Sequence, residues 1–308
     1  MRLRTVRKAA FAAAVALVAV AGCSQGGAPP SGEGTATATD GGTGGTTETV
    51  GAEVRLEDDE TGEPVDGGTL RMLLRLDADK LDPHVATDTT GVIVGALVYE
   101  GLVENVRGEI VPALAQEWEM SDDGTTYTFT LREGATFHGG RTVTSEDVAY
   151  SLARVADPET LSPSGSSYAV IESVDTPDES TVVLNLSRPH APMLAQLASL
   201  SASVVDREVV EAGGLGVPDG GTGPFVLAEH NVGRNIVLTA NADYWNPELP
   251  HVDGIDMTWN PDDNARAAAI RSGDVDVLFR PAPEFIDSLK SDSAVKWYGG
   301  SGSLPSSS

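Results

Sequence analysis

The sequence is poor in cysteine and in basic residues. Cys23 is the only cysteine among 308 residues, so the chain can form no internal disulfide and no metal site from several thiolates. Lys and Arg number 20 against 46 Asp and Glu, which gives a formal net charge of −26. This imbalance argues against nucleic acid or an anionic membrane surface as a partner of the folded part. The hydrophobic fraction of 40% is nevertheless typical of a globular chain.

Common catalytic signatures are also missing. The sequence has neither the G-x-S-x-G element of serine hydrolases nor the G-x-x-x-x-G-K-[ST] phosphate loop. Residues 293–296, SAVK, fit S-x-x-K, but the other elements of that hydrolase pattern are absent. These absences argue against a secreted serine hydrolase and against a phosphate-binding loop.

The N-terminus has the layout of an export signal. Four basic residues within 2–8 precede the apolar run 9–22, which is too short to cross a bilayer comfortably. The run ends in Val-Ala-Gly-Cys, which resembles the lipobox of bacterial lipoproteins. We predict a signal peptide over residues 1–22 and a palmitate-type lipid on Cys23 that anchors the protein to the outer face of the cell membrane.

The next segment has a composition that is typical of disorder. Residues 24–66 are mainly Gly, Thr, Ser, Ala and acids, with almost no large apolar side chain. Such a segment buries too little surface to offset the entropy lost on ordering. We predict that 23–66 is a lipidated, disordered tether and that the folded domain begins at residue 67.

Apolar periodicity predicts both strands and helices after residue 67. Alternation of period two predicts strands near 70–76, 127–131, 182–186 and 255–259. Helices are expected at about 89–100, 145–155, 191–200 and 263–272. The last has Asp262 and Asp263 at its positive end and Gly273 just past its C-terminus as the expected stop signal. The mixture indicates an α/β or mixed α+β architecture.

The stretch 136–148, TFHGGRTVTSEDV, combines a histidine, two glycines and two acids. We interpret it as a strand end at Phe137 or His138, a Gly-Gly turn, and a helix whose N-cap is Thr144. Asp147, three residues later, would complete a capping box. A metal or catalytic role for His138 is the weaker interpretation, because neither a second histidine at ligand spacing nor an adjacent nucleophile accompanies it.

Longer motifs point to a family. They are LDPH (81–84), YEGLV (99–103), the region 112–158, RPHAPMLAQLA (188–198), GTGPFVLAEH (221–230), NADYWN (241–246) and ARAAAIRSGDVDVL (265–278). Together they resemble the extracellular solute-binding proteins of family 5, the peptide, dipeptide and nickel binders of ABC importers, over about residues 67–300. The resemblance implies a periplasmic-binding-protein-like II fold, and a receptor that passes a peptide or related solute to a membrane permease. It also implies no enzyme activity and no cofactor, because such a receptor performs no chemistry on its ligand.

The same resemblance assigns ligand contacts. In the family, the loop after LDPH lies along the ligand main chain, and this loop maps onto Thr87, Asp88 and Thr89. Their polar groups suit peptide N–H and C=O groups, although an ordinary turn that caps the next helix explains them equally well. Some members carry an aromatic ligand contact where this chain has Ser164, with Tyr168 as a distant substitute.

The family's second lobe should begin just after residue 300, whereas this sequence ends at residue 308. We interpret 67–308 as the first lobe only, from an interrupted reading frame or a fragment, with a natural one-lobe protein as the alternative. Weak or absent peptide binding and a tendency to aggregate are then expected, because one lobe encloses little of a ligand and exposes the apolar surface that would meet the second lobe. A non-functional truncated fragment is therefore one alternative. A surface lipoprotein for sensing or adhesion on the same scaffold is the other function left open.

Overall fold

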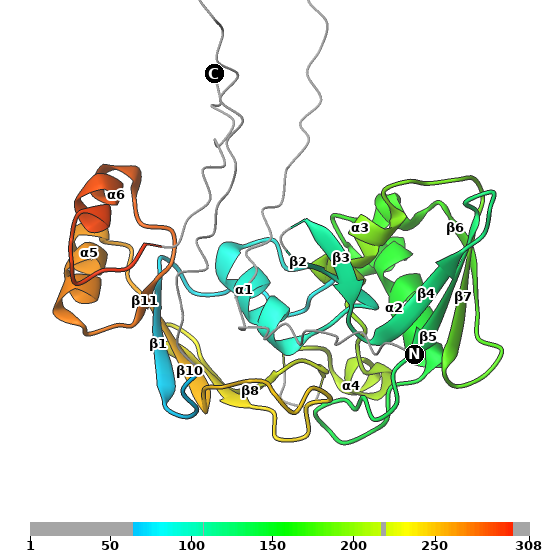
Figure 1. Ribbon diagram of the computed structural model, residues 1–308, viewed down its shortest axis with the longest axis horizontal. Helices are drawn as coiled ribbons and strands as arrows, with labels where there is room; N and C mark the ends of the chain where they lie inside the picture. The colour runs from blue at the N-terminus through cyan, green and yellow to red at the C-terminus, as the bar shows by residue number, and fades with distance from the viewer. Residues whose placement is uncertain (1–63, 107, 217–219, 298–308) are drawn as a thin grey trace, which may run out of the picture.

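The computed structural model describes residues 64–106, 108–216 and 220–297 (Figure 1). The predicted signal peptide, Cys23 and the tether as far as residue 63 lie outside these residues. Within the described part of the chain, none of the helices combines the length and the apolar character needed to cross a membrane.

Two β-sheets organise the chain, and each has its own hydrophobic core (Figure 1). The five-stranded sheet has the order β11-β1-β10-β9-β8 and is made of β1 (Thr69–Leu74), β8 (Phe225–Asn231), β9 (Asn235–Ala240), β10 (Gly254–Trp259) and β11 (Val277–Leu278). The four-stranded sheet has the order β4-β5-β7-β6 and is made of β4 (Ala115–Met120), β5 (Thr126–Leu131), β6 (Ile171–Asp175) and β7 (Thr181–Leu186). A separate hairpin joins β2 (Val103–Val106) to β3 (Glu109–Pro112).

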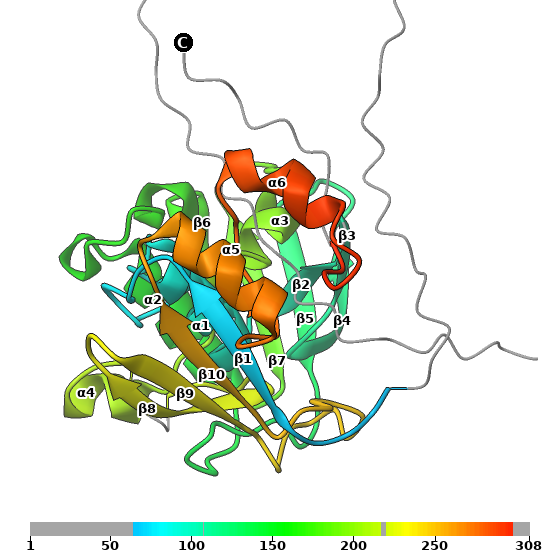
Figure 2. The same ribbon diagram turned by 90° about the vertical axis from the view of Figure 1, so that its left-hand side faces the viewer.

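The first strand lies inside the five-stranded sheet and is parallel to both neighbours, β10 and β11. Figure 2 shows β1 beside β10. Met72 and Leu74 are buried as the alternation predicts, but Leu73 on the other face is buried too. The strand ends at Leu74, and Leu76 is 62% exposed, so the predicted continuation to Leu76 is wrong. Parallel strands covered on both faces carry continuous apolar runs, for which strict alternation is a poor guide.

The four-stranded sheet is antiparallel and follows the predicted alternation. Every second residue of β5 and of β7 is buried, with Phe129 and Leu184 fully enclosed. Helix α2 (Ser145–Ala156) packs against this face through Val148, Leu152 and Val155, which belong to the same core. The alternation of apolar residues in the strands and the apolar stripe along the helix favour this arrangement, in which an amphipathic helix covers one face of an antiparallel sheet.

The helices mostly agree with the predicted segments. They are α1 (Thr89–Val98), α2, α3 (Met193–Leu197), α4 (Arg207–Ala212), α5 (Asp263–Ser272) and α6 (Pro283–Lys290), with 3-10 turns η1 (Pro158–Thr160), η2 (Gly165–Tyr168) and η3 (Leu200–Ala202). The carboxylate of Asp262 caps α5, and Gly273 ends it with a φ of 75°. The helix predicted over 191–200 is wrong in length, because α3 stops at Leu197. The Ser199 hydroxyl donates to the Gln196 carbonyl at 2.6 Å, a local bond that competes with further helix.

Candidate functional site

The parallel strands β1, β10 and β11 end at one edge of the five-stranded sheet. Each is followed by a connection and then by a helix, α1, α5 or α6 respectively; the connection is short after β10 and β11, whereas after β1 it covers residues 75–88. Arg75, just beyond β1, forms an ion pair of 3.3 Å with Asp263 at the start of α5, which ties two of these connections together. Ligands of open α/β sheets bind outside the carboxyl ends of parallel strands, so this edge is the first place to look for a site.

Thr87, Asp88 and Thr89 lie at this edge, at the start of α1. The Asp88 carboxylate accepts hydrogen bonds from the backbone N–H groups of Gly91 at 2.8 Å and Asp79 at 3.2 Å. Asp88 is therefore the N-cap of α1, which is the turn-and-cap alternative left open by the sequence. Thr87 and Thr89 are exposed, and neither hydroxyl bonds to another residue of the described chain.

The loop that carries these threonines is held by a network around its LDPH motif. Arg154 of α2 donates to both carboxylate oxygens of Asp82, at 2.6 and 3.1 Å, and to His84 Nδ1 at 2.7 Å. His84 Nε2 lies 2.9 Å from the Ser203 carbonyl. Burial lowers the pKa of His84 to about 4, against the opposing effect of that carbonyl. The neutral ring thus accepts from Arg154 and donates to Ser203, and it fixes the loop to α2.

The stretch 136–148 is a junction between the two sheets. His138 donates its backbone N–H to Gly221 at 2.8 Å, and its Nε2 lies 3.0 Å from the Gly223 carbonyl. Residues 136 and 142 form a single antiparallel bridge instead of the predicted strand end. The capping box is confirmed, since the Asp147 carboxylate accepts from the backbone N–H of Thr144 at 2.9 Å.

Arg141 of the same stretch bridges two carboxylates. It pairs with Asp147 at 2.7 Å and with Asp206 at 2.9 Å, and both acids are largely buried. These bonds raise the pKa of Arg141 above its ordinary range, the bond to Asp147 most of all. The contacts of His138, Arg141 and Asp147 are therefore all with other parts of the fold, which supports a structural role for this stretch.

A further buried group links the sheets. The Glu100 carboxylate, just after α1, accepts from the Tyr244 hydroxyl at 2.8 Å and from Trp245 Nε1 at 3.0 Å. The guanidinium carbon of Arg132, which follows β5, lies 3.4 Å from the centre of the Trp245 ring. Burial raises the pKa of Glu100 to about 7, although the bonds from Tyr244 and Trp245 oppose the shift.

Ser164 is half-buried and lies just before η2, which packs against α2. Within the described residues, no hydrogen bond joins it to the loop at the start of α1. The interpretation of Tyr168 as a substitute ligand contact is wrong. Its ring is buried in the core, and its hydroxyl lies 3.0–3.2 Å from the Gln196 carbonyl and the Ser199 and Ser201 hydroxyls.

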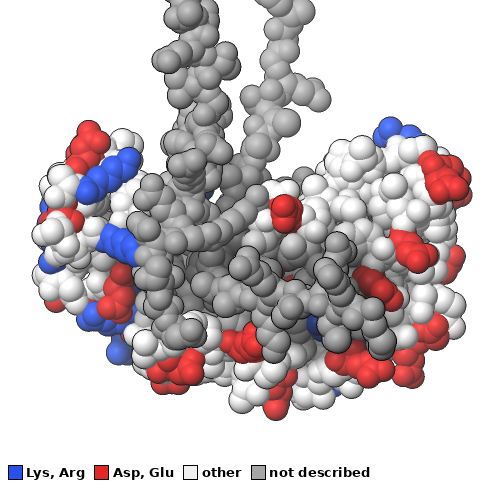
Figure 3. All heavy atoms as spheres, viewed as in Figure 1, with Lys and Arg blue, Asp and Glu red and all other residues white. Residues whose placement is uncertain are grey.

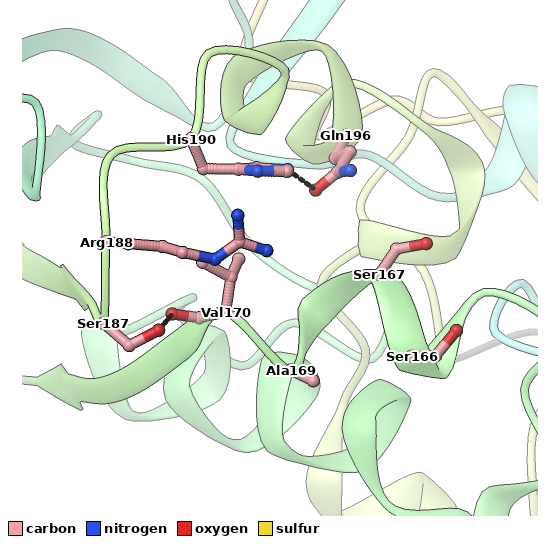
Figure 4. A pocket seen from close by; sticks show the side chains of 8 residues that line it. All are labelled: Ser166, Ser167, Ala169, Val170, Ser187, Arg188, His190 and Gln196. Carbon is pink, nitrogen blue, oxygen red and sulfur yellow. Dashed lines mark hydrogen bonds between the residues drawn. The ribbon is translucent and has the colours of Figure 1, made fainter.

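A small hollow opens beside η2 (Figure 4). Its volume is about 390 Å³, and it is lined by Ser166, Ser167, Ala169, Val170, Ser187, Arg188, His190 and Gln196. No ligand-binding role was predicted for these side chains, although Arg188, His190 and Gln196 belong to the family motif RPHAPMLAQLA (188–198). Over residues 64–106, 108–216 and 220–297, no group of three or more His, Cys, Asp or Glu side chains is arranged to hold a metal ion.

Comparison with known proteins identifies relatives over most of the described chain. The family model of bacterial extracellular solute-binding proteins, family 5 Middle, matches residues 109–306. Di/tripeptide-binding protein 2 of Pseudomonas aeruginosa is 34% identical, over 59% of this chain and 39% of its own length. The dipeptide-binding protein of Escherichia coli is 33% identical, over 64% of this chain and 42% of its own. The chain thus spans about two-fifths of the length of the curated relatives it matches.

Solved structures show the same fold. The binding protein AgaA of Agrobacterium tumefaciens, in complex with agropinic acid, superposes with a TM-score of 0.70 and 34% identity over 73% of this chain and 46% of that one. The binding protein DppA of Helicobacter pylori, in complex with the peptide STSA, gives a TM-score of 0.66 and 28% identity over 74% and 50%. The predicted periplasmic-binding-protein-like II fold is therefore confirmed for the portion of that fold which this chain covers.

Proposed function

Because the chain belongs to the bacterial extracellular solute-binding proteins of family 5, we propose that it captures peptides outside the cytoplasm and delivers them to an ABC importer. The relatives are named for dipeptides, di- and tripeptides and glutathione, which are all short peptides or peptide-like molecules. The family binds solutes and is not a family of enzymes. Under this proposal the protein captures and releases its ligand without a chemical step.

The observation that carries the proposal is the position of Thr87 and Thr89. Both lie exposed at the edge of the sheet where its parallel strands end, and the Arg154–Asp82–His84 network holds their loop in place. A hydroxyl can donate to a carbonyl or accept from an N–H, so these two residues suit a peptide main chain in an extended conformation. The Asp88 carboxylate fixes the turn between them, which makes its part in binding an indirect one.

Ser164 is proposed as a second ligand-facing position. A serine offers a small hydroxyl where some family members offer an aromatic ring. The contact would contribute a hydrogen bond and little apolar burial, which favours polar or small ligand side chains at that point.

We also propose that Cys23 carries the lipid anchor that keeps the receptor at the outer face of the cell membrane. The support is the sequence Val-Ala-Gly-Cys after a short apolar run with basic residues before it. A tether over 24–66, composed mainly of small and acidic residues, would let the folded domain reach its permease partner in the membrane.

Peptide binding is best tested by NMR titration, which registers weak as well as tight binding. The purified chain is titrated with di- and tripeptides, and with free amino acids and a disaccharide for comparison. The double variant Thr87→Val with Thr89→Val removes two hydroxyls at nearly constant shape, and Thr239→Val, exposed on β9, is the matched control. We expect peptide binding that weakens about five-fold or more in the double variant only. Binding of amino acids or sugars but of no peptide would contradict the proposal.

A further inference from the structure

The hollow beside η2 is built from three segments. Ser166 and Ser167 come from η2, Ala169 and Val170 precede β6, and the remaining lining residues follow β7. Figure 4 shows the Arg188 side chain lying between Val170 on one side and the His190–Gln196 pair on the other, with its guanidinium directed into the hollow. The site therefore has a cation inside a defined, small volume.

Arg188 forms no ion pair with an acidic side chain of the described chain, a property it shares with Arg132, Arg234 and Arg280, but among these four it alone lines this hollow. Most of the other described arginines pair with Asp or Glu: Arg71, Arg75, Arg141, Arg154, Arg207, Arg266 and Arg271. Acidic side chains are spread over the face shown in Figure 3, yet none lines this hollow. A guanidinium carries five donors and no acceptor, so its natural partner here is an anion from outside.

The neutral groups around Arg188 add donors. His190 Nε2 lies 3.2 Å from Gln196 Oε1, so the ring donates there and the amide N–H groups of Gln196 stay available. The hydroxyls of Ser166 and Ser167 form no hydrogen bond with another described residue, whereas that of Ser187 donates to the Val170 carbonyl at 3.2 Å. The hollow thus offers one positive charge and several neutral donors, which matches a singly charged acceptor.

We propose that this hollow binds a carboxylate group, with Arg188 as the cation that receives it. The planar fork of arginine fits the two oxygens of a carboxylate, and a single cation balances one negative charge rather than the two of a phosphate. Ser164, proposed above as a ligand-facing position, lies two residues before Ser166 in the chain. Under the proposed function, on which this step rests, the carboxylate is the C-terminal or acidic side-chain group of a bound peptide. Arg188 is exposed, so salt weakens the pairing.

The first test needs no peptide. The Nε–Hε signal of Arg188 and the backbone amide signals of the lining residues are followed by NMR while acetate is added to the whole chain at low salt, with acetamide and inorganic phosphate in parallel titrations. We expect saturable shifts with acetate, none with acetamide, and weaker binding of phosphate. Followed by the backbone amides, Arg188→Gln should weaken acetate binding about five-fold, and Arg234→Gln, exposed on the β8–β9 turn, should not. A shift that merely follows ionic strength, equal binding by Arg188→Gln, or tighter binding of phosphate would overturn the proposal.

A second arm separates this inference from peptide capture itself. Peptides with a free C-terminus and their C-terminal amides are titrated into the wild type and Arg188→Gln. The inference predicts that Arg188→Gln weakens the free acids to the level of the amides and leaves the amides unchanged. Acetate binding without any peptide binding would end the proposed function and leave the carboxylate site standing. If peptides bind equally well to the wild type and to Arg188→Gln, with or without C-terminal amidation, the carboxylate site is refuted and the proposed function stands.

Discussion

Tyr244 and Glu100 lie 144 residues apart in the sequence, and the phenol of one donates to the carboxylate of the other at 2.8 Å. Trp245 donates to the same carboxylate, and Arg132 from the four-stranded sheet covers the Trp245 ring. Glu100 follows α1, which packs in the core of the five-stranded sheet. This contact therefore helps to hold the two sheets in one arrangement, and its protonation should be visible in stability.

Replacement of Glu100 by Gln should change how stability depends on pH. Burial raises the pKa of Glu100 to about 7 from an ordinary value of 4.5, so the folded chain holds this proton more tightly than the unfolded chain. The stabilising contribution is complete below about pH 4.5 and is lost as pH rises to about 7. Relative to Glu100→Gln, the wild type should lose about 1–3 kcal/mol of unfolding free energy across this interval.

Urea unfolding at several pH values between about 4.5 and 7.5 measures this difference. Glu172→Gln, exposed on β6, is the matched control and should run parallel to the wild type. Parallel curves for Glu100→Gln and the wild type would show that Glu100 titrates as an ordinary surface carboxyl.

Arg141 should be far more important for stability than a surface arginine. Its replacement by Met leaves Asp147 and Asp206, both largely buried, without their shared cation. We expect a loss of about 2–4 kcal/mol in denaturant unfolding. Arg207→Met is the control, because the Arg207–Glu211 pair is exposed and should contribute at most about 0.5 kcal/mol. Equal losses for the two variants would refute the bridging role of Arg141.

Replacement of Thr144 by Ala tests the capping box of α2. The Thr144 hydroxyl donates to Asp147 at 3.0 Å, so its removal should cost about 0.5–2 kcal/mol in denaturant unfolding.

Replacement of His138 by Ala tests whether this histidine has a structural role. His138→Ala should lower stability through the lost contact with the Gly223 carbonyl, but peptide binding by the folded variant should stay the same. A folded His138→Ala protein that no longer binds peptide would return His138 to the ligand site.

Lipid attachment at Cys23 is tested by metabolic labelling with a fatty-acid analogue. The wild type should be labelled and fractionate with membranes, whereas Cys23→Ser should be unlabelled. Ser24→Ala, the neighbouring change, is the control and should leave labelling intact. Labelling of Cys23→Ser at the wild-type level would remove the proposed anchor.

The sequence predicted those elements whose signals are local. Asp262 and Asp263 at its start and Gly273 at its end mark α5, and the alternation through Phe129 marks a strand with one buried face. Both signals depend on neighbours within a few residues, which a single sequence contains. The buried Leu73 and exposed Leu76 were misjudged because burial in a parallel sheet depends on strands about 200 residues away.

The candidate site was predictable only in part, for the same reason. The position of Thr87 and Thr89 at the start of α1 could be taken from a family motif, and Asp88 as a cap from its place before the helix. The burial of Tyr168 could not, since its hydroxyl is bonded by a segment about 30 residues away. Arg188 could not be predicted as a site residue either, because the hollow that it lines is formed with residues 166–170, which lie about 20 residues away in the sequence.

Uptake of labelled peptide by cells tests the central claim, peptide capture for import, most directly. Deletion of the gene that encodes this chain should reduce uptake of isotope-labelled di- or tripeptides at low external concentration, and reintroduction of the gene should restore it. Uptake of a labelled sugar should not change in either strain. Peptide uptake that is the same with and without the gene, for every di- and tripeptide tried, would contradict the account.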